Sequence, residues 1–205
     1  MTHRILVLGE SVSLYQPERH EVLIRRILER YLIDYPKPKR GVPRFLLNDV
    51  LRYWRTLAVD YQAKRWEEVQ STRGLRYLKL LISRKLAFAG FLIPLLLCEK
   101  ADVDYFVEQL AMPPMARVAQ LHDISSGFHA PLRTLFEVAE EFAAMLANKE
   151  FREEAKTVIA PSEKETWPMR FREIRRRADD LQDALEAIFF ESDLLGRKSK
   201  RYLSF

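Results

Sequence analysis

The most apolar segment of the chain reads GLRYLKLLISRKLAFAGFLIPLLLCE and runs from Gly74 to Glu99. Its apolar residues cover most of the circumference of the predicted helix, which is typical of a buried helix. Pro94 lies near its end, where proline kinks or terminates a helix. The unbroken apolar run, Leu86 to Cys98, has 13 residues, too few to cross a bilayer. We therefore expect a central core helix and no contact with a membrane.

Apolar residues recur at spacings of three and four on both sides of this helix, which predicts further amphipathic helices. Their expected ranges are 17–34, 44–66, 103–111 and 115–121, followed by a C-terminal hairpin of two long helices around residues 132–146 and 171–188. Prolines mixed with basic residues at 36–43 predict an extended linker. The predicted organisation is an N-terminal part, 1–35, and one compact helical bundle, 44–205. A basic stretch at 196–201 is expected to be a mobile tail.

Residues 4–8, RILVL, form a run rich in β-favouring residues without polar alternation, which favours a strand buried on both faces. No second strand is apparent in the sequence. Unpaired backbone groups cost about 1–3 kcal/mol each when buried, so the strand would need a sheet from another chain or from a second copy. The expected fold class is thus mainly α, with a central buried helix, a C-terminal hairpin and one short N-terminal β-strand.

Composition sets limits on function. The chain has 205 residues, with 34 Lys and Arg against 29 Asp and Glu, and this mild excess suits an anionic partner. Its single cysteine, Cys98, excludes an internal disulfide and a cysteine-based zinc site, and it favours a cytoplasmic location. With six glycines, the chain does not favour chemistry on Gly-rich phosphate loops.

Two predicted helices carry polar faces that would form a cationic cleft if they met. These residues are Asn48, Arg52 and Arg55 on the helix at 44–66, and Arg76, Lys79 and Ser83 on the central helix. Cations on a buried helix need partners, and a phosphate group would satisfy them. Alternatively, Asp49 and Asp60 neutralise the same bases as a purely structural network.

Two stretches of the chain resemble a known helical region: FLLNDVLRYWRTL at 45–57, followed by Asp60-Tyr61 and Lys64, and the stretch from Gly74 to Leu86. That helical region follows the catalytic domain in bacterial nucleotidyltransferases of the DNA polymerase beta superfamily. Residues 4–11, with Leu14-Tyr15, are similar to the last strand and turn of that catalytic sheet. The resemblance covers residues 3–90 and implies a helical half that holds a nucleoside triphosphate. The residues it implies for that site are Asn48, Arg52, Tyr53, Arg55, Lys79, Ser83, Arg84 and Lys85.

In that superfamily a Gly-Ser turn and an Asp-x-Asp pair hold two divalent metals. Here Asp102 and Asp104 have this spacing, but they follow the central helix without a Gly-Ser turn, and we interpret them as a helix N-terminus. We therefore expect no intrinsic metal or cofactor, and Mg²⁺ only with a bound nucleoside triphosphate. The missing motifs imply a separate catalytic chain as partner.

Two other functions are compatible with the sequence. Arg117 and His122 have the Arg-x4-His spacing of HEPN ribonucleases, in which the histidine acts as acid or base beside an arginine that stabilises the phosphate. The second function is that of a non-catalytic interaction module, because a cluster of arginines would bind nucleic acid with a steep dependence on salt. This cluster is Arg170, Arg172, Arg175, Arg176 and Arg177. Charge runs of this kind are also common on solvated helix faces.

Overall fold

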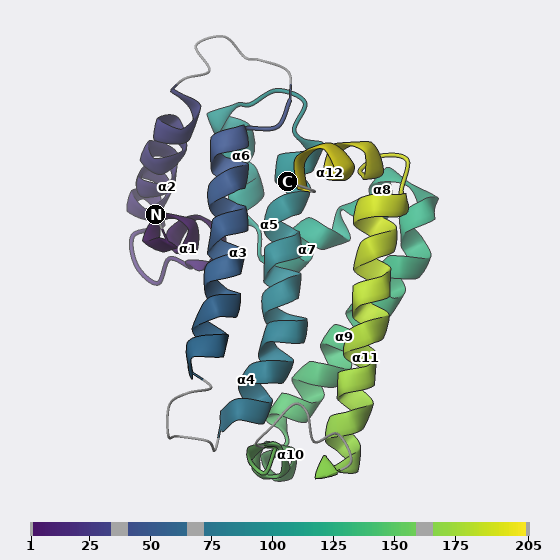
Figure 1. Ribbon diagram of the computed structural model, residues 1–205. Coiled ribbons are helices and arrows are strands. Elements are labelled where there is room, and N and C mark those ends of the chain that lie inside the picture. The colour runs from purple at the N-terminus through teal and green to yellow at the C-terminus, as the bar shows by residue number, and fades with distance from the viewer. Residues whose placement is uncertain (1, 34–40, 65–71, 159–165, 204–205) are drawn as a thin grey trace.

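The chain forms a helical bundle in the computed structural model, which describes residues 2–33, 41–64, 72–158 and 166–203 (Figure 1). No β-strand occurs within these ranges. The elements in chain order are α1 (Thr2–Glu10), α2 (Pro17–Leu32), α3 (Arg44–Lys64), α4 (Arg73–Lys79), the π-helical η2 (Leu80–Arg84), α5 (Lys85–Leu97), α6 (Val103–Ala111), α7 (Pro114–Ala119), α8 (Leu121–Ile124), the 3-10 turn η3 (Ser126–Phe128), α9 (His129–Ala147), α10 (Lys149–Lys156), α11 (Met169–Glu186), the π-helical η5 (Ala187–Glu191) and α12 (Gly196–Leu203). The prediction of a mainly α-helical protein is confirmed.

The segments α4, η2 and α5 join into one continuous helix from Arg73 to Leu97. Most residues of α5 are buried, and Figure 1 places it between α3 and α11, so the prediction of a central buried helix is confirmed. By length and composition alone this helix could cross a membrane. However, 56% of its most apolar window is buried within the fold, as is typical of a core helix.

Gly90 allows α5 and α7 to approach closely. A Cβ atom placed on Gly90 would lie only 2.4 Å from the carbonyl oxygen of Pro114, the first residue of α7. Contacts this short do not occur for real Cβ atoms, and the atom in the way belongs to the backbone. The absence of a side chain at Gly90 therefore fixes how α7 packs on the central helix.

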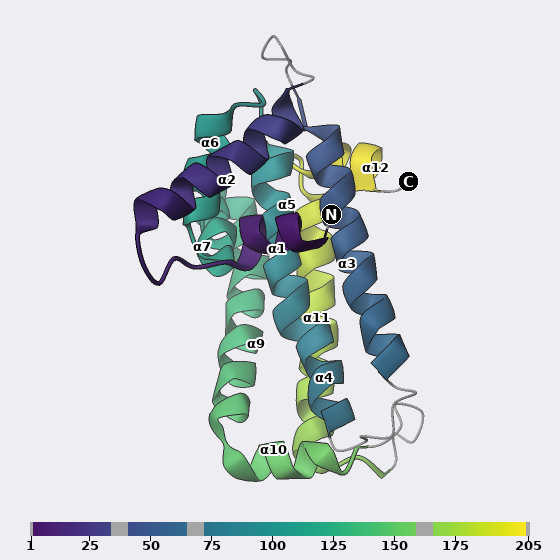
Figure 2. The same ribbon diagram turned by 90° about the vertical axis from the view of Figure 1, so that its left-hand side faces the viewer.

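The two long C-terminal helices, α9 and α11, pack side by side, as predicted (Figures 1 and 2). Their buried residues include Leu135 and Phe142 on α9 and Leu181 on α11. The short helix α10 lies between them in the chain and crosses one end of the pair, with Phe151 buried. The hairpin is thus closed by a packed helix.

Residues 4–8 form part of α1, so the prediction of an N-terminal β-strand is wrong. Ile5 and Leu8, three residues apart, are buried on one face of α1, while Leu6 is exposed. The helix packs against α3 and α5 (Figure 2). A short apolar run fits a buried helical turn as well as a strand, and periodicity alone cannot distinguish them. Because helical hydrogen bonds satisfy this backbone, it needs no sheet from another chain.

The basic stretch at 196–201 is also structured, so the prediction of a mobile tail is wrong. It lies in α12, where Ser199 is fully buried. Lys198 Nζ donates a hydrogen bond to the carbonyl oxygen of Leu96, at 2.6 Å. A lysine that bonds a carbonyl in the last turn of a helix compensates the unsatisfied acceptors there. This contact anchors α12 to the end of α5.

The predicted linker at 36–43 lies mostly outside the described residues. In its described part, the amide of Gly41 donates to the carbonyl oxygen of Glu99, at 3.0 Å. One cluster of buried residues contains Ile5 of α1, Leu28 of α2 and Leu181 of α11. The N-terminal helices therefore share the core of the bundle.

Candidate binding sites

The two helices that carry the predicted cleft do lie side by side. Trp54 of α3 stacks on Phe88 of α5, with ring centroids 5.0 Å apart. Further along, Tyr61 of α3 stacks on Tyr77 of α4, with centroids 6.1 Å apart. Stacked aromatic rings thus connect α3 and the central helix at two points along their length.

Glu10, the last residue of α1, joins two of the predicted site residues. It accepts a hydrogen bond from the hydroxyl of Tyr53, at 2.8 Å, and forms an ion pair with Arg84, at 2.5 Å. Burial, followed by the hydrogen bond to Glu10, raises the pKa of Tyr53 above its usual value. One carboxylate therefore connects α1, α3 and η2, and it neutralises one cation of the predicted cleft.

The other site residues on α3 point to the surface. The side chains of Asn48, Arg52 and Arg55 are exposed. Arg52 lies 3.9 Å from Asp49, which also accepts a hydrogen bond from Tyr31, at 2.7 Å. This part matches the structural network considered as an alternative to a phosphate cleft.

The remaining site residues lie on more than one side of the central helix. Lys79 and Ser83 are exposed. Lys85 instead faces α11, where its Nζ donates to Gln182 Oε1 at 2.7 Å, and burial lowers the pKa of this amine, helped by Arg175. The structure thus brings together Tyr53 and Arg84 and separates Lys85 from them. The hollow beside Tyr53 and Arg84 has a volume of only about 10 Å³.

Arg117 and His122 do not share a surface. Arg117 is buried, with 2% of its surface exposed, and lines a cavity beside α1 and α6. His122 is exposed and stacks on His129, with ring centroids 4.1 Å apart, at a separate surface hollow. In this arrangement the guanidinium of Arg117 is not placed to contact an RNA phosphate beside His122.

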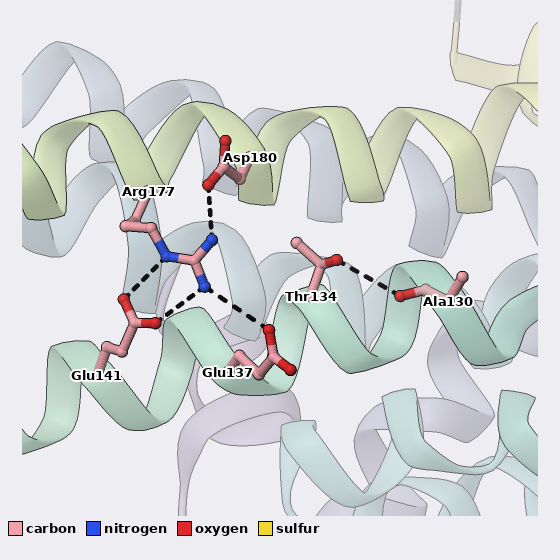
Figure 3. A network of polar contacts seen from close by, with 6 residues as sticks. All are labelled: Ala130, Thr134, Glu137, Glu141, Arg177 and Asp180. Carbon is pink, nitrogen blue, oxygen red and sulfur yellow. Dashed lines mark hydrogen bonds and ion pairs between the residues drawn. The ribbon is translucent and has the colours of Figure 1, made fainter.

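The arginine cluster on α11 is largely paired with acids (Figure 3). Arg177 binds Glu141 on α9 and Asp180 on its own helix. Arg175 pairs with Asp179 at 2.5 Å, and Arg170 lies within 4 Å of Glu150. Arg172 and Arg176 are exposed. The positive charge available to a nucleic acid on this helix is therefore smaller than the sequence indicates.

Within the described ranges, no group of three or more His, Cys, Asp or Glu side chains is placed to hold a metal ion. Asp102 is the N-cap of α6 and accepts a hydrogen bond from the amide of Asp104, at 3.1 Å. The Asp104 carboxylate pairs with Arg25 of α2, at 2.5 Å. The interpretation of this Asp-x-Asp as a helix N-terminus is confirmed.

A cavity that the sequence did not predict lies between α1, α2, α6 and α7. Its volume is about 660 Å³, within the range of roughly 300–1,000 Å³ that is usual for small-molecule sites. The only sequence signal for it is Arg117, an isolated charge within the short helix PMARVA. The other lining residues come from segments distant in the chain, so local patterns do not reveal the cavity.

No protein-family model, curated protein or solved structure matches this chain significantly.

Proposed function

We propose that this chain is the helical, nucleotide-binding half of a nucleotidyltransferase-like assembly and acts with a separate catalytic chain. Support comes from the resemblance of residues 45–57 and 74–86 to that helical region. The Asp-x-Asp at Asp102 and Asp104 serves as a helix cap, so we assign the catalytic step to the partner.

The observation that carries this proposal is the junction at Glu10. Its contacts with Tyr53 and Arg84 bring the end of α1 next to the predicted nucleotide site on α3 and η2. The triphosphate would then bind on the surface beside this junction, with Mg²⁺, because the hollow itself is too small. Arg55, Lys79 and Arg84 are the exposed cations that would contact it.

The π-helical turn η2 supports this assignment. A π-helical turn forms i→i+5 hydrogen bonds, and such turns are frequent at functional sites. Lys79 directly precedes this turn, and Arg84, five residues further on, is its last residue. In a regular α-helix such residues would be separated by about 140° around the axis. The π turn brings them closer to one face, where both can contact the same phosphate chain.

The N-terminal region offers a surface for the catalytic partner. Four large apolar side chains are exposed near α1, namely Leu6, Val12, Leu14 and Tyr15, and Leu14 has 98% of its surface exposed. Apolar patches of this kind often mark interaction sites. We assign these exposed side chains to contact with the catalytic chain.

Titration calorimetry with MgATP tests the nucleotide site. We expect the wild-type chain to bind, and the double variant Arg55→Ala/Lys79→Ala to bind at least about tenfold more weakly, because two charge-assisted contacts are lost. The control Arg172→Ala/Arg176→Ala removes the same charge from α11 and should bind like wild type. Equal affinities of all three proteins, or no binding to the wild type, would refute the assigned site.

A further inference from the structure

The cavity of about 660 Å³ has an apolar interior. It is bounded by the end of α1, the start of α2, α6 and the turn into α7, which cluster on one side of the molecule (Figure 2). Apolar lining residues include Ile24 of α2, Val107 and Leu110 of α6, and Met112. A ligand here would place an apolar body against these side chains.

One charged side chain lining this cavity is almost fully buried. Arg117 donates from Nε to the carbonyl oxygen of Met112, at 2.9 Å, and from Nη2 to those of Leu110, at 3.2 Å, and Gly9, at 3.5 Å. Its Nη1 has no hydrogen-bond partner among the described residues. None of the ion pairs described includes Arg117, so the guanidinium lacks a carboxylate partner in this part of the chain.

A purely structural role explains only part of this arrangement. Gly9 and Leu110 lie at the C-terminal ends of α1 and α6, and helix C-termini carry partial negative charge that stabilises a cation. Burial lowers the pKa of Arg117 to about 10, so the group stays charged near neutral pH. The helix ends engage Nε and Nη2 but leave the two N–H groups of Nη1 unsatisfied. Buried donors normally have partners.

A second polar pair, Ser11 and His20, lies on the cavity wall. The Ser11 hydroxyl donates its single hydrogen to the carbonyl oxygen of Val7, at 2.5 Å, and its Oγ is 2.7 Å from His20 Nε2. Because the serine hydrogen is already used, His20 Nε2 must be the donor in the second bond. This histidine therefore does not activate Ser11 as a nucleophile, and the pair fits binding better than catalysis.

Acidic groups among the lining residues restrict the charge of the ligand. Asp104 and Glu21 lie 2.5 Å and 3.7 Å from Arg25, and Glu108 also lines the cavity. Arg25 neutralises part of this negative charge, and the remaining acidic charge disfavours a multiply charged phosphate more than a single carboxylate. A single negative charge next to Arg117 remains compatible with them.

We propose that this cavity binds a small monocarboxylate with an apolar body, whose carboxylate pairs with the guanidinium of Arg117. Because Nη1 is enclosed in the structure, the guanidinium has to turn toward the cavity for Nη1 to donate to the ligand. Glu10 and Val12 line this cavity as well, but Arg117 is not among the residues assigned to the triphosphate, so the binding of hexanoate and of MgATP can be tested separately.

Hexanoate is a suitable probe, with n-hexanol and inorganic phosphate as comparisons. Calorimetry should show saturable binding of hexanoate, with binding of hexanol and phosphate at least tenfold weaker. The Nε–H NMR signal of Arg117 should shift on addition of hexanoate. Hexanol binding as tightly as hexanoate, or phosphate binding more tightly, would overturn the proposal. If the folded wild-type protein binds no hexanoate, the proposal is wrong and Arg117 only caps the ends of α1 and α6.

Two variants complete the test. Arg117→Met, checked for helicity by circular dichroism, should lose hexanoate binding by at least tenfold, while Arg133→Met, at an exposed site outside the cavity, should retain it. If Arg117→Met does not fold, Ala111→Trp tests the proposal instead. Ala111 is an exposed lining residue, so a large ring there would fill the cavity and should weaken hexanoate binding. Unchanged hexanoate affinity in a folded Arg117→Met or Ala111→Trp variant would contradict the proposal.

Discussion

Arg177 of α11 and Glu141 of α9 form a bidentate ion pair across the C-terminal hairpin (Figure 3). Both nitrogen–oxygen distances are 2.9 Å, and Asp180 binds the remaining Nη1 of the same guanidinium at 2.6 Å. Hydrogen bonds to Glu141 and Asp180 raise the pKa of Arg177 further above its already high value. This arginine therefore holds the hairpin together and is not available to a ligand.

Replacing Arg177 by lysine should destabilise the protein although the charge is kept. A lysine cannot reproduce the two parallel hydrogen bonds to Glu141. Because both groups are partly exposed, we expect a loss of only about 1 kcal/mol, measured by urea unfolding. Arg176→Lys is the matched control, since Arg176 is exposed on the same helix. Equal destabilisation by the two substitutions would show that the bidentate geometry contributes nothing.

Introducing one methyl group at Gly90 should have a larger effect. In Gly90→Ala the new Cβ would meet the Pro114 carbonyl oxygen at 2.4 Å, so α5 and α7 must move apart. Overpacking of this kind costs about 1–3 kcal/mol, which thermal or urea unfolding would detect. At Gly127 a Cβ would meet only Ser125 Oγ, at 3.6 Å, so Gly127→Ala serves as control. A Gly90→Ala variant as stable as wild type would contradict the close approach.

The main helices could be predicted from sequence because their signals are local. Periodic apolar residues identified α3, α11 and the central helix within a few residues of their observed bounds. The sequence of residues 4–8 does not distinguish a strand from a helix, because its four apolar residues are too few to establish a period. Their helical state is decided by tertiary packing of Ile5 and Leu8 against α3 and α5.

The candidate sites were harder to predict because they depend on contacts between distant parts of the chain. Glu10 is separated by 43 residues from Tyr53 and by 74 from Arg84, and no pattern within one helix indicates these pairs. The orientation of Lys85 toward α11 likewise depends on the packing of the central helix. The spacing of Arg117 to His122 is visible in the sequence, whereas the burial of Arg117 depends on the packing of the folded chain.

Stability should decrease in alkaline solution because three tyrosine hydroxyls are bonded in the fold. Burial is the largest cause that raises the pKa of each of Tyr31, Tyr53 and Tyr105 above the usual 10.0. The unfolded chain therefore loses these protons first, so the stabilisation is complete below pH 10 and is lost as the pH rises above it. The lowered pKa of Arg117 changes the free energy of unfolding in the opposite direction, but this is one group against three tyrosines.

The free energy of unfolding should thus fall from about pH 10 upward, by up to about 1.4 kcal/mol per pH unit for each tyrosine. Urea unfolding at several pH values between 8 and 11 measures this slope. A triple Tyr→Phe variant at residues 31, 53 and 105 should show a flatter profile. A wild-type profile that stays level up to pH 11 would contradict the buried, hydrogen-bonded state of these hydroxyls.

Glu10 offers the sharpest test of the proposed nucleotide site. Glu10→Gln removes a negative charge beside Arg84, so that cation becomes available to a phosphate, and MgATP should bind about threefold to tenfold more tightly. The amide oxygen can still accept the hydrogen bond from Tyr53, so we expect a loss of stability of only about 1 kcal/mol. Calorimetry and urea unfolding measure the two effects. Glu29→Gln, an exposed charge change on α2, should alter neither. If a folded Glu10→Gln protein binds MgATP no more tightly than wild type, the Glu10 junction has no influence on nucleotide binding.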